Sequence, residues 1–387
     1  MSMKILSLFD GMACGMIAMK LAGVDVESYD AYEIDKYAVK TAQHNFPMIR
    51  EHGDVFTADF TQYEGVDFLV GGSPCTYWSI AQTKNRETVA SGMGWELFSQ
   101  YVRALREAKP KYFIYENNKS MSKQIRASIG EAFGFEAVLI NSALVSAQNR
   151  QRLYWVGKRN ADGTYSKVNV EQPEDRGILL KDVLDSAVAM REKGHAVIAS
   201  AGRTTEREYF TKNQGNMVAE PINCTADRKA KTVSASYAYK GDGEGSLKSE
   251  LFPDNPIKQT SNYVGYAIEF DENGKPIKAI GKDGKQITVY EVSNGQITIK
   301  GKQYSIKLKD GYYIIRKLTV TECKRLQTVP EWYDFSCVSN SQAYKMLGNG
   351  WTCEVIAHLI RACICPAEEK LKRKYPDGFD PERSRNR

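Results

Sequence analysis

The sequence predicts an α/β protein in which a mostly parallel sheet carries helices on both faces, joined to a smaller region rich in β-strands. Two observations support this fold class. Over about the first 160 residues, short apolar runs alternate with helix-like patterns, which is typical of a doubly wound sheet. From about residue 176 to 313, turn signals multiply and short alternating segments replace the helix-like patterns.

The elements of the first part follow from these apolar runs. Strands are expected at Lys4–Phe9, Ser28–Glu33, Phe68–Val70 and Tyr112–Tyr115, and an extended segment at Gln148–Val156. Helices are expected at Met12–Leu21 and at Trp95–Glu107, where Lys109-Pro110 ends the second one. In sheets of this kind, ligands bind at the carboxyl ends of the strands.

Hairpin-type dipeptides mark the second region. They are Asn273-Gly274, Asp283-Gly284, Asn294-Gly295 and Asp310-Gly311. Helical periodicity then returns and predicts a helix at Thr352–Arg361, followed by a charged tail. We therefore expect a first domain at 1–175, a β-rich domain at 176–313, a segment at 314–365 that returns to the first domain, and a tail at 366–387.

Composition restricts the setting of the protein. A net charge of +6, from 53 Lys and Arg against 47 Asp and Glu, permits a polyanionic partner but fits an ordinary soluble enzyme equally well. The eight cysteines include no CxxC pair, and no His cluster lies beside them, so no metal site is expected. No run of about 18 apolar residues occurs, and the N-terminal run resembles a strand more than a signal peptide. A cytoplasmic protein with reduced thiols is expected.

A glycine-rich loop with a cysteine follows the buried strand at Phe68–Val70. The segment Gly71-Gly72-Ser73-Pro74-Cys75 places the thiol at the carboxyl end of that strand, where a nucleophile belongs in an open α/β sheet. The alternative is a cysteine that packs as a small buried hydrophobe, which is the commoner fate of this residue.

Other polar groups are expected at the same edge of the sheet. Glu116 follows the strand at Tyr112–Tyr115, although a helix cap or a solvated loop acid would also explain it. Arg150 and Arg152 alternate, so both lie on one face of an extended segment, where two guanidinium groups suit a phosphate or a base edge. An exposed edge strand is the alternative for this pair.

The loop after the first strand suits a nucleotide-like cofactor. Leu8–Gly15 contains a glycine-bearing turn between the first strand and the first helix, without the full G-x-G-x-x-G pattern. Glu33 ends the second strand and is placed to accept from ribose hydroxyls, while Asp54 is placed to accept from an exocyclic amine.

Taken together and in this order, these segments resemble the DNA (cytosine-5) methyltransferase family, of bacterial or phage type. The likeness covers about 1–158 and 314–362 and includes eight motifs. They are the first at Phe9–Gly15, the second and third at Glu33 and Asp54, the fourth at Pro74-Cys75, the sixth at Glu116-Asn117, the eighth at Gln148–Arg152, the ninth at Arg316–Thr319 with Glu322 and Arg325, and the tenth at Ser341–Tyr344 with Gly348–Trp351.

Three positions depart from the family pattern. Ser7 stands where the family often has an Asp, and Asp10 instead resembles the animal de novo DNA methyltransferases. Asn118 replaces the Val of the sixth motif, and Gly350 takes the place of a serine in the tenth. The departures in the first and tenth motifs bear on cofactor packing, and none removes a catalytic group.

The resemblance implies a Rossmann-like S-adenosylmethionine-dependent methyltransferase domain with a smaller β-rich target-recognition domain at 176–313. Cys75 would add to carbon 6 of a flipped-out cytosine, which makes carbon 5 nucleophilic toward the methyl group. Glu116 would hold N3 and the exocyclic amine of the base. Arg152 would hold the base oxygen, and Arg150 would fix Glu116 or a phosphate near the thiolate.

The resemblance also assigns binding residues. Those for S-adenosyl-L-methionine are Phe9, Asp10, Gly11, Glu33, Ile34, Asp54, Val55, Pro74, Asn349 and Trp351. Those expected at double-stranded DNA are Lys84 and Arg86, in a loop at 76–94 with Gly92 and Gly94 as hinges, and Arg228, Lys231 and Thr232 in the β-rich region. A solvated turn is the alternative for the last three. A monomer with no membrane or metal partner is expected.

Other functions explain fewer of these features. A transfer-RNA cytosine methyltransferase with the same core is disfavoured by the large turn-rich insertion, since a duplex reader needs such a domain for base contacts. A non-catalytic DNA-binding regulator is disfavoured because Cys75, Glu116 and Arg152 are all present. A plain Rossmann oxidoreductase predicts neither the Pro-Cys loop nor the paired arginines.

Overall fold

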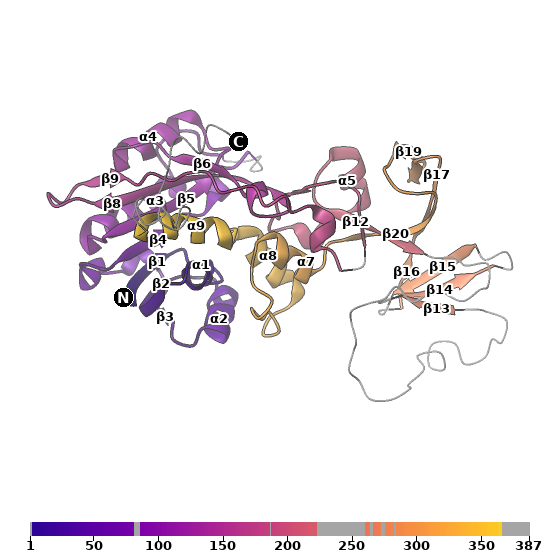
Figure 1. The fold of residues 1–387 in the computed structure, drawn as a ribbon, viewed down its shortest axis with the longest axis horizontal. Helices are drawn as coiled ribbons and strands as arrows, with labels where there is room; N and C mark the ends of the chain where they lie inside the picture. Colours follow the sequence, from indigo (N-terminus) through magenta and orange to yellow (C-terminus); the bar gives the residue numbers. More distant parts are fainter. Residues whose placement is uncertain are drawn as a thin grey trace, which may run out of the picture. The chain divides into compact units, whose positions relative to one another are not determined.

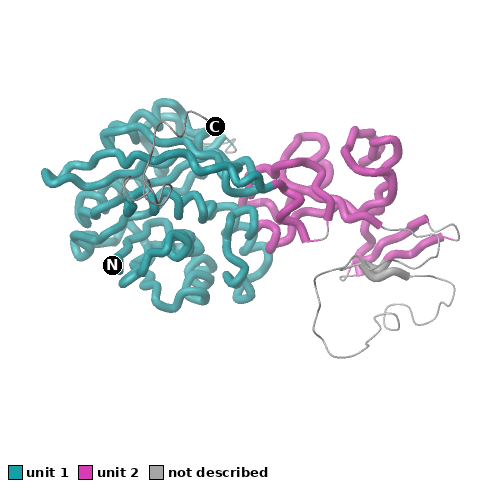
Figure 2. The backbone as a smooth tube through the Cα atoms, viewed as in Figure 1, with its two compact units in different colours: residues 1–178, 324–387 teal, residues 179–323 magenta. Residues whose placement is uncertain are grey.

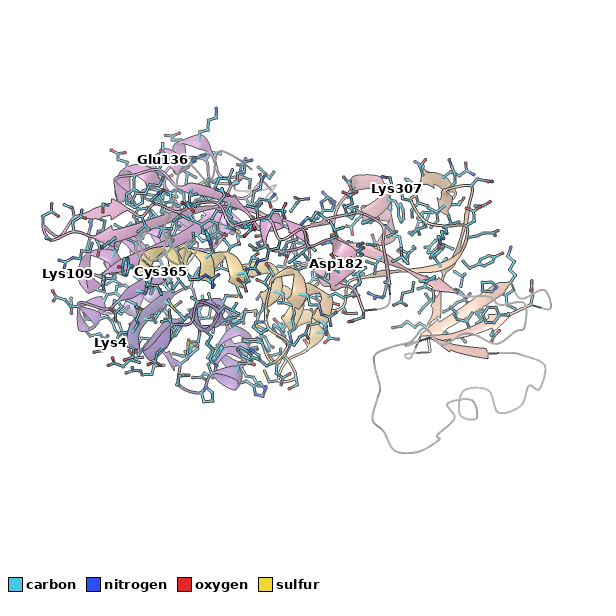
Figure 3. The ribbon with its side chains drawn as sticks, viewed as in Figure 1. Lys4, Lys109, Glu136, Asp182, Lys307 and Cys365 are labelled. Atoms are coloured by element: carbon cyan, nitrogen blue, oxygen red, sulfur yellow. The ribbon has the colours of Figure 1, made fainter. Side chains whose placement is uncertain are left out.

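The computed structural model describes residues 2–80, 86–185, 187–222, 260–263, 266–271, 275–281 and 284–365. The chain divides into two compact units: unit 1 comprises residues 1–178 and 324–387, and unit 2 comprises residues 179–323 (Figure 2). Charged side chains such as Lys109 and Glu136 of unit 1 and Lys307 of unit 2 are exposed to solvent (Figure 3). None of the described helices combines the length and apolar character that a bilayer span requires.

An eight-stranded sheet forms the centre of unit 1 (Figure 1). Its strands are β1 (Ser2–Leu8), β2 (Asp25–Tyr32), β3 (Arg50–Glu51), β4 (Phe68–Gly71), β5 (Tyr112–Asn118), β6 (Val138–Asn141), β8 (Gln151–Arg159) and β9 (Tyr165–Lys167). They follow the spatial order β3-β2-β1-β4-β5-β8-β6, and β9 also pairs with β8. The strands from β3 to β5 in this order are parallel, whereas β8 runs antiparallel to all its partners.

The strand order reverses between β1 and β4, and this reversal determines where a ligand fits. The chain leaves β1 and β4 in opposite directions, so the loops beyond their carboxyl ends leave a crevice between them. Since β8 is antiparallel to β5, the first residues of β8 lie at the same edge of the sheet as the last residues of β5. The glycine turn, the cysteine loop, Glu116 and the paired arginines therefore belong to one edge.

Helices cover both faces of this sheet. On one face, α3 (Met93–Ala108) and α4 (Lys123–Phe133) pack against the sheet in a cluster that contains Leu69, Tyr101 and Tyr115. On the other face, α1 (Cys14–Leu21) packs on α9 (Cys353–Ile364), and its Gly15 lies against Tyr29. In α3 and α4, apolar side chains at helical spacing form one buried side, whereas α1 is buried over the six consecutive residues Cys14–Met19; this burial stabilises the layers.

Unit 2 is built from two antiparallel sheets. The larger has the order β10-β12-β20-β17-β18-β19 and the smaller the order β13-β14-β15-β16. The bounds are β10 (Val188–Ala189), β12 (Met217–Ile222), β13 (Thr260–Tyr263), β14 (Tyr266–Phe270), β15 (Pro276–Gly281), β16 (Gln286–Ile287), β17 (Val289–Ser293), β18 (Gln296–Ile299), β19 (Lys302–Ser305) and β20 (Gly311–Lys317). A helix, α5 (Glu206–Lys212), contributes Tyr209 to the core of the larger sheet.

A charged cluster is enclosed within unit 2. The guanidinium of Arg316 in β20 donates to Glu220 at 2.5 Å and to Glu322 at 2.8 and 2.9 Å. Burial opposes the ionisation of Glu322, but the hydrogen bonds and the charge of Arg316 outweigh it, so the pKa of this carboxyl is lowered. Arg316 and Glu322 belong to the ninth motif of the sequence, and here they tie β20 to β12 and to the following helix, α7 (Val320–Leu326).

The predicted α/β fold class is confirmed, and the structure adds elements that the sequence patterns did not reveal. These are α2 (Lys36–Asn45), α4, β3, β6 and α8 (Asn340–Asn349). Unit 2 ends at residue 323, further along the chain than the boundary at 313 expected from sequence, because β20 pairs with β12.

The hairpin dipeptides divide into two groups. Asn294 and Gly295 both have positive φ and connect β17 to β18, as expected for a two-residue turn. Asp310-Gly311 instead leads into β20. A tight turn that the dipeptide pattern missed lies at Lys300-Gly301, between β18 and β19. Asn273-Gly274 and Asp283 lie outside the described residues.

Candidate active site

A cavity of about 230 Å³ opens at the carboxyl edge of the unit 1 sheet. Its lining comes from the loops after β1, β2 and β4, from β5, from the start of β8, and from α8 and the residues after it. The lining residues expected from sequence are Phe9, Asp10, Gly11, Glu33, Pro74, Cys75, Glu116, Arg150, Arg152, Asn349 and Trp351. The fold therefore gathers the proposed nucleophile, the proposed acid and most of the proposed cofactor residues at one place.

The cysteine loop is held by side chains of β5. The hydroxyl groups of Ser73 and Tyr115 share a hydrogen bond of 2.6 Å, and the Asn117 amide donates to the Ser73 carbonyl at 3.1 Å. Gly72 is required by close packing, because a Cβ at this position would come within 2.7 Å of the Glu116 carbonyl oxygen. The loop thus presents Cys75 as an exposed residue directly after β4.

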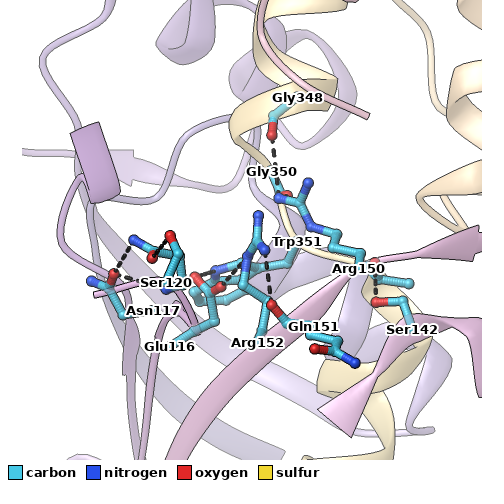
Figure 4. Close-up of polar contacts among 12 residues, drawn as sticks. Glu116, Asn117, Ser120, Ser142, Arg150, Gln151, Arg152, Gly348, Gly350 and Trp351 are labelled. Carbon is cyan, nitrogen blue, oxygen red and sulfur yellow. Dashed lines mark hydrogen bonds and ion pairs between the residues drawn. The ribbon is translucent and has the colours of Figure 1, made fainter. Parts of the chain in front are cut away.

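Glu116 is held by an ion pair and a hydrogen bond. The Nε of Arg152 lies 3.0 Å from one carboxylate oxygen of Glu116, and the indole Nε1 of Trp351 donates to the other at 3.1 Å (Figure 4). The Arg152 and Glu116 side chains retain 18% and 13% of their exposure, so the pair faces the cavity rather than the core. Either group is therefore accessible to a ligand in the cavity.

Arg150 has a different environment from Arg152. It is buried, and its guanidinium donates to the carbonyl oxygens of Gly348 at 3.2 Å and Gly350 at 2.8 Å (Figure 4). Burial, followed by the charge of Arg152, lowers the pKa of Arg150 to about 10. Arg150 thus fixes the end of α8 against the start of β8, and it forms a buried part of the cavity lining.

Competing effects act on the Cys75 thiol. The cavity wall removes part of the surrounding water, which raises the pKa of this thiol, and the charge of Glu116 raises it further. Arg152 and Arg150 act in the opposite direction. The net effect is a raised pKa, so the Cys75 thiol ionises less readily than an ordinary thiol.

The loop after β1 is organised by Glu33. Its carboxylate accepts from the backbone N–H groups of Gly11 at 2.9 Å and of Ile34 and Asp35 at 2.8 Å. Phe9, Gly11 and Ala13 adopt positive φ in this loop, and at Gly11 the residue type suits that conformation. Glu33 therefore joins the turn after β1 to the end of β2 and faces the cavity at the same time.

Asp10 takes the place of the acid that the family often has at position 7, where this chain has Ser7. The hydroxyls of Ser7 and Tyr29 donate to the same oxygen of Asp10 at 2.5 and 2.6 Å, so a serine at position 7 supports an acid at position 10. Its other oxygen, Oδ2, is buried and has no partner among the described residues. Burial raises the pKa of Asp10 to about 6, against the lowering effect of the two hydroxyls.

A third acid near this cluster was not expected from sequence. Register places Ser7, Ala31 and Glu51 side by side on β1, β2 and β3, so the three side chains share one face of the sheet. Both carboxyl oxygens of Glu51 are buried and lack a hydrogen-bond partner within the described part of the chain. Burial, then the charges of Asp10 and Glu33, raises the pKa of Glu51 to about 8.

Several expected cofactor and DNA residues lie away from the cavity lining. Ile34 is largely exposed, the Asp54 side chain accepts from the Phe56 N–H, and Val55 is buried. Arg86 donates to the carbonyl oxygens of Trp78 and Ser120, which ties its loop to the end of β5. Lys84, Arg228, Lys231 and Thr232 lie outside the described residues.

The two remaining departures from the family pattern have local explanations. Asn118 is buried, and its side-chain oxygen accepts from the Ser120 hydroxyl at 2.7 Å, so this polar replacement is satisfied. Gly350 leaves room for Cys14, because a Cβ there would lie 3.0 Å from the Cys14 sulfur and 3.0 Å from the Met346 carbonyl oxygen. No cluster of three or more His, Cys, Asp or Glu side chains suited to a metal ion occurs among the residues described.

Comparison with known proteins identifies the family. The chain belongs to the C-5 cytosine-specific DNA methylases, whose family model matches residues 3–365. It is 25% identical over 436 residues to the orphan methyltransferase M.SPRI of Bacillus phage SPR, covering 94% of this chain and 97% of that one. It is 24% identical over 365 residues to the type II methyltransferase M.NgoPII of Neisseria gonorrhoeae, covering 90% and 91% of the two chains. The predicted family and enzyme class, a DNA (cytosine-5) methyltransferase, are confirmed.

Solved structures support the fold. The S. pombe Dnmt2 methyltransferase aligns over 94% of this chain and 98% of its own, with a TM-score of 0.52 and 13% identity. The Entamoeba histolytica methyltransferase EhMeth aligns over 94% and 98%, with a TM-score of 0.53 and 10% identity. At this level of identity the likeness concerns the fold, which is the predicted Rossmann-like methyltransferase fold.

Proposed function

We propose that this enzyme methylates carbon 5 of a flipped-out cytosine in a specific site of double-stranded DNA, with Cys75 as the covalent nucleophile. One observation carries the proposal: the Cys75 thiol, the Glu116 carboxylate and the Arg152 guanidinium line the same cavity as the glycine turn and Glu33. A nucleophile and an acid beside a nucleotide-type turn are what a methyl transfer to a pyrimidine requires.

The cavity suits S-adenosyl-L-methionine, which supplies an electrophilic methyl group when it is bound. Asp10 and Glu33 are acids of the lining and favour a cation, whereas the charge of Asp35 is balanced by Lys345 at 2.7 Å, which also lines the cavity. The buried Oδ2 of Asp10 lacks a donor among the described residues, so a ligand N–H would satisfy it. Phe9, Gly11, Pro74, Asn349 and Trp351 complete the proposed binding set. Ile34, Asp54 and Val55 remain proposed cofactor-binding residues. Because they lie outside the lining of this cavity, they would contact the cofactor where it extends beyond it.

The chain's own groups would carry the chemistry on the base. Cys75 gives its proton to solvent and its sulfur bonds to carbon 6, which places negative charge on the pyrimidine ring. After methyl transfer to carbon 5, a base removes the proton at that carbon and the bond between carbon 6 and sulfur breaks, which releases Cys75. Glu116 is proposed to hold N3 and the exocyclic amine and to deliver a proton to N3 as that charge develops. Arg152 is proposed to hold the base oxygen, while the charge of Arg150 favours the thiolate.

Unit 2 is the proposed target-recognition domain. Its described residues contribute nothing to the cavity lining, and antiparallel ribbons of this kind can present side chains to the major groove. The stretch that includes Arg228, Lys231 and Thr232 is the proposed contact region, and Lys84 and Arg86 are proposed phosphate contacts. For Arg86, binding a phosphate would require release of one of its two backbone carbonyl partners.

The covalent step is tested by trapping. Purified protein is incubated with labelled S-adenosylmethionine and with duplex DNA that carries 5-fluorocytosine, which blocks release of the enzyme. A complex stable to denaturing electrophoresis is expected for the wild type and none for Cys75→Ser, because a hydroxyl is a far weaker nucleophile than a thiolate. Methyl transfer by Cys75→Ser at more than a few per cent of the wild-type rate would contradict the mechanism.

The choice of substrate is tested separately. Duplex DNA is compared with transfer RNA as methyl acceptor, and 5-methylcytosine is mapped in DNA from cells that express the protein. Site-specific methylation of duplex DNA is expected. Transfer to transfer RNA alone would favour the second candidate function, with the cavity chemistry unchanged.

The contact region of unit 2 is tested by substituting Arg228, Lys231 and Thr232 by Ala, one at a time. Loss of a base contact should relax discrimination at one position by about 1–3 kcal/mol, whereas loss of a phosphate contact should weaken all sites alike and flatten the salt dependence. If none of the three shows either pattern, the DNA reader lies elsewhere in unit 2.

A further inference from the structure

The hydrogen bond between Trp351 and Glu116 connects two parts of the chain that are distant in sequence. The indole Nε1 donates to Glu116 Oε2 at 3.1 Å across a separation of 235 residues. Trp351 lies immediately beyond α8, in the tenth motif, and was expected from sequence to contact the cofactor. It lines the cavity together with Glu116 (Figure 4).

The backbone around Trp351 is fixed from several directions. The Gly350 carbonyl oxygen, which belongs to the preceding peptide, accepts from Arg150 at 2.8 Å and from the Gln327 side chain at 3.3 Å. Gln327 is buried and also donates to the Leu347 carbonyl oxygen at 2.6 Å. The indole is therefore attached to a rigid support, and its N–H has a defined position relative to β5.

The chemistry of the two groups that contact Glu116 defines what Trp351 does. An indole N–H and a guanidinium donate hydrogen bonds but cannot accept them. Arg152 forms an ion pair with one oxygen and Trp351 donates a hydrogen bond to the other, so the two contacts together orient the Glu116 carboxylate. Gly72 leaves room for this arrangement, since a Cβ there would lie 3.1 Å from Glu116 Oε2.

We propose that Trp351 is a positioning residue for Glu116: its indole N–H holds the carboxylate in the orientation in which it meets the base. This inference rests on the proposed role of Glu116 as the group that binds N3. When N3 and the exocyclic amine of the base approach, the Glu116 carboxylate exchanges one of its protein contacts for the base. Trp351 holds the carboxylate in the same orientation before each exchange. The tenth motif thereby acts on the base as well as on the cofactor.

The test uses Trp351→Phe, which keeps an aromatic ring in the cavity wall and removes the N–H. We expect kcat to fall by about 5- to 20-fold, the effect of losing one hydrogen bond to a charged group. The pH profile of kcat/KM for DNA should move toward higher pH, because the ionised carboxylate loses a stabilising donor. The dissociation constant for S-adenosylmethionine should change by no more than about twofold, since the ring remains.

Trp155→Phe is the matched control. Trp155 is buried in β8 near Tyr115, and its Nε1 has no partner among the described residues, so the substitution removes an indole N–H that bonds to nothing there. It should lower the melting temperature and leave the pH profile of kcat/KM in place.

The outcomes separate the inference from the proposed function. A lower kcat for Trp351→Phe with an unchanged pH profile, or a loss of cofactor affinity that accounts for the whole defect, would overturn the positioning role. Absence of methyl transfer by the wild type would count against the proposed function instead. Wild-type activity together with a shifted profile in Trp351→Phe, but not in Trp155→Phe, supports both.

Discussion

Two arginine–glutamate groups of this protein have the same chemistry and different surroundings. In unit 1, Arg152 and Glu116 face a cavity and keep 18% and 13% of their side-chain exposure. In unit 2, Arg316 meets Glu220 and Glu322; Arg316 and Glu220 also keep 13% each, but Glu322 keeps none, and these three residues are absent from the cavity lining. Both groups fall in sequence motifs of the family. The difference teaches that a motif charge can serve the reaction or hold the fold, and that access to the cavity decides between the two.

The surroundings also determine how each group responds to change. A pair that faces water-accessible space can exchange a partner for a ligand, because water or substrate compensates the lost contact. An enclosed pair cannot, since removing one member leaves the other charge buried without compensation. We therefore expect substitutions in the unit 1 pair to change mainly the rate, and substitutions in the unit 2 cluster to change mainly the free energy of unfolding.

The largest effect is expected for Glu116→Gln. The amide keeps the shape of the side chain but cannot supply the proton that the proposed reaction needs, so kcat should fall by about 10²- to 10⁴-fold. The free energy of unfolding should change by about 1 kcal/mol or less, because the pair with Arg152 is partly exposed. Steady-state kinetics and urea denaturation measure the two quantities on the same preparation.

Glu107→Gln serves as the control for that variant, since Glu107 pairs with Arg103 on the surface of α3 at 3.5 Å and lies outside the cavity lining. Its kcat should stay within about twofold of the wild type. If Glu116→Gln retained most of its rate and lost several kcal/mol of stability, the two arginine–glutamate groups would not differ as described.

The reverse pattern is expected for Arg316→Met in unit 2. Removing the guanidinium leaves Glu220 and Glu322 without their shared partner, and the free energy of unfolding should fall by about 3–5 kcal/mol. Arg325→Met is the control, because Arg325 pairs with the exposed Glu331 at 2.8 Å, and that pair should contribute about 1 kcal/mol or less. Equal stability losses in the two variants would show that enclosure of the Arg316 cluster has no energetic consequence.

A smaller effect is expected for Glu33→Ala on cofactor affinity. Glu33 accepts the Gly11 N–H and lines the cavity, so its loss removes a proposed charge-assisted hydrogen bond and loosens the turn after β1. The affinity for S-adenosylmethionine should fall by about 1–3 kcal/mol by calorimetry, with little change in the KM for DNA. An exposed acid of the same unit, Glu64, provides the control as Glu64→Ala. Unchanged cofactor affinity in Glu33→Ala would remove this residue from the proposed site.

The smallest effect concerns pH and Glu51. Burial, followed by the charges of Asp10 and Glu33, raises the pKa of Glu51 from 4.5 to about 8. The folded protein thus binds this proton more tightly than the unfolded chain, so its stabilising contribution is complete below pH 4.5 and is lost as pH rises toward 8. Glu51→Gln resembles the protonated acid and should remove that loss.

The melting temperature of Glu51→Gln should match the wild type near pH 5 and exceed it by about 1–3 °C near pH 8.5. Glu27→Gln, at an exposed position of β2, should follow the wild type across the range. If the melting temperatures of the wild type and Glu51→Gln changed with pH in parallel, the carboxyl oxygens of Glu51 would have a hydrogen-bond partner in solution and the carboxyl would ionise normally.

The sequence by itself determined the local context of the catalytic groups. Each lies where an apolar strand meets a polar loop, as at Val70 to Cys75, and the periodicity of such runs needs no knowledge of distant residues. The order of these strand-loop units also restricts the topology, because parallel strands require crossovers and ligands collect at their carboxyl ends. The family motifs, the α/β class and the edge that carries the cavity follow from that information.

Tertiary structure alone decided which of these groups touch. The contact between Trp351 and Glu116, the placement of Glu51 across Ala31 from Ser7, and the space at Gly350 that Cys14 fills all join segments far apart in the chain. Side-chain periodicity reports which face of an element is buried but not what lies opposite that face. Those partners depend on strand order and register and on helix packing, which are properties of the folded chain as a whole.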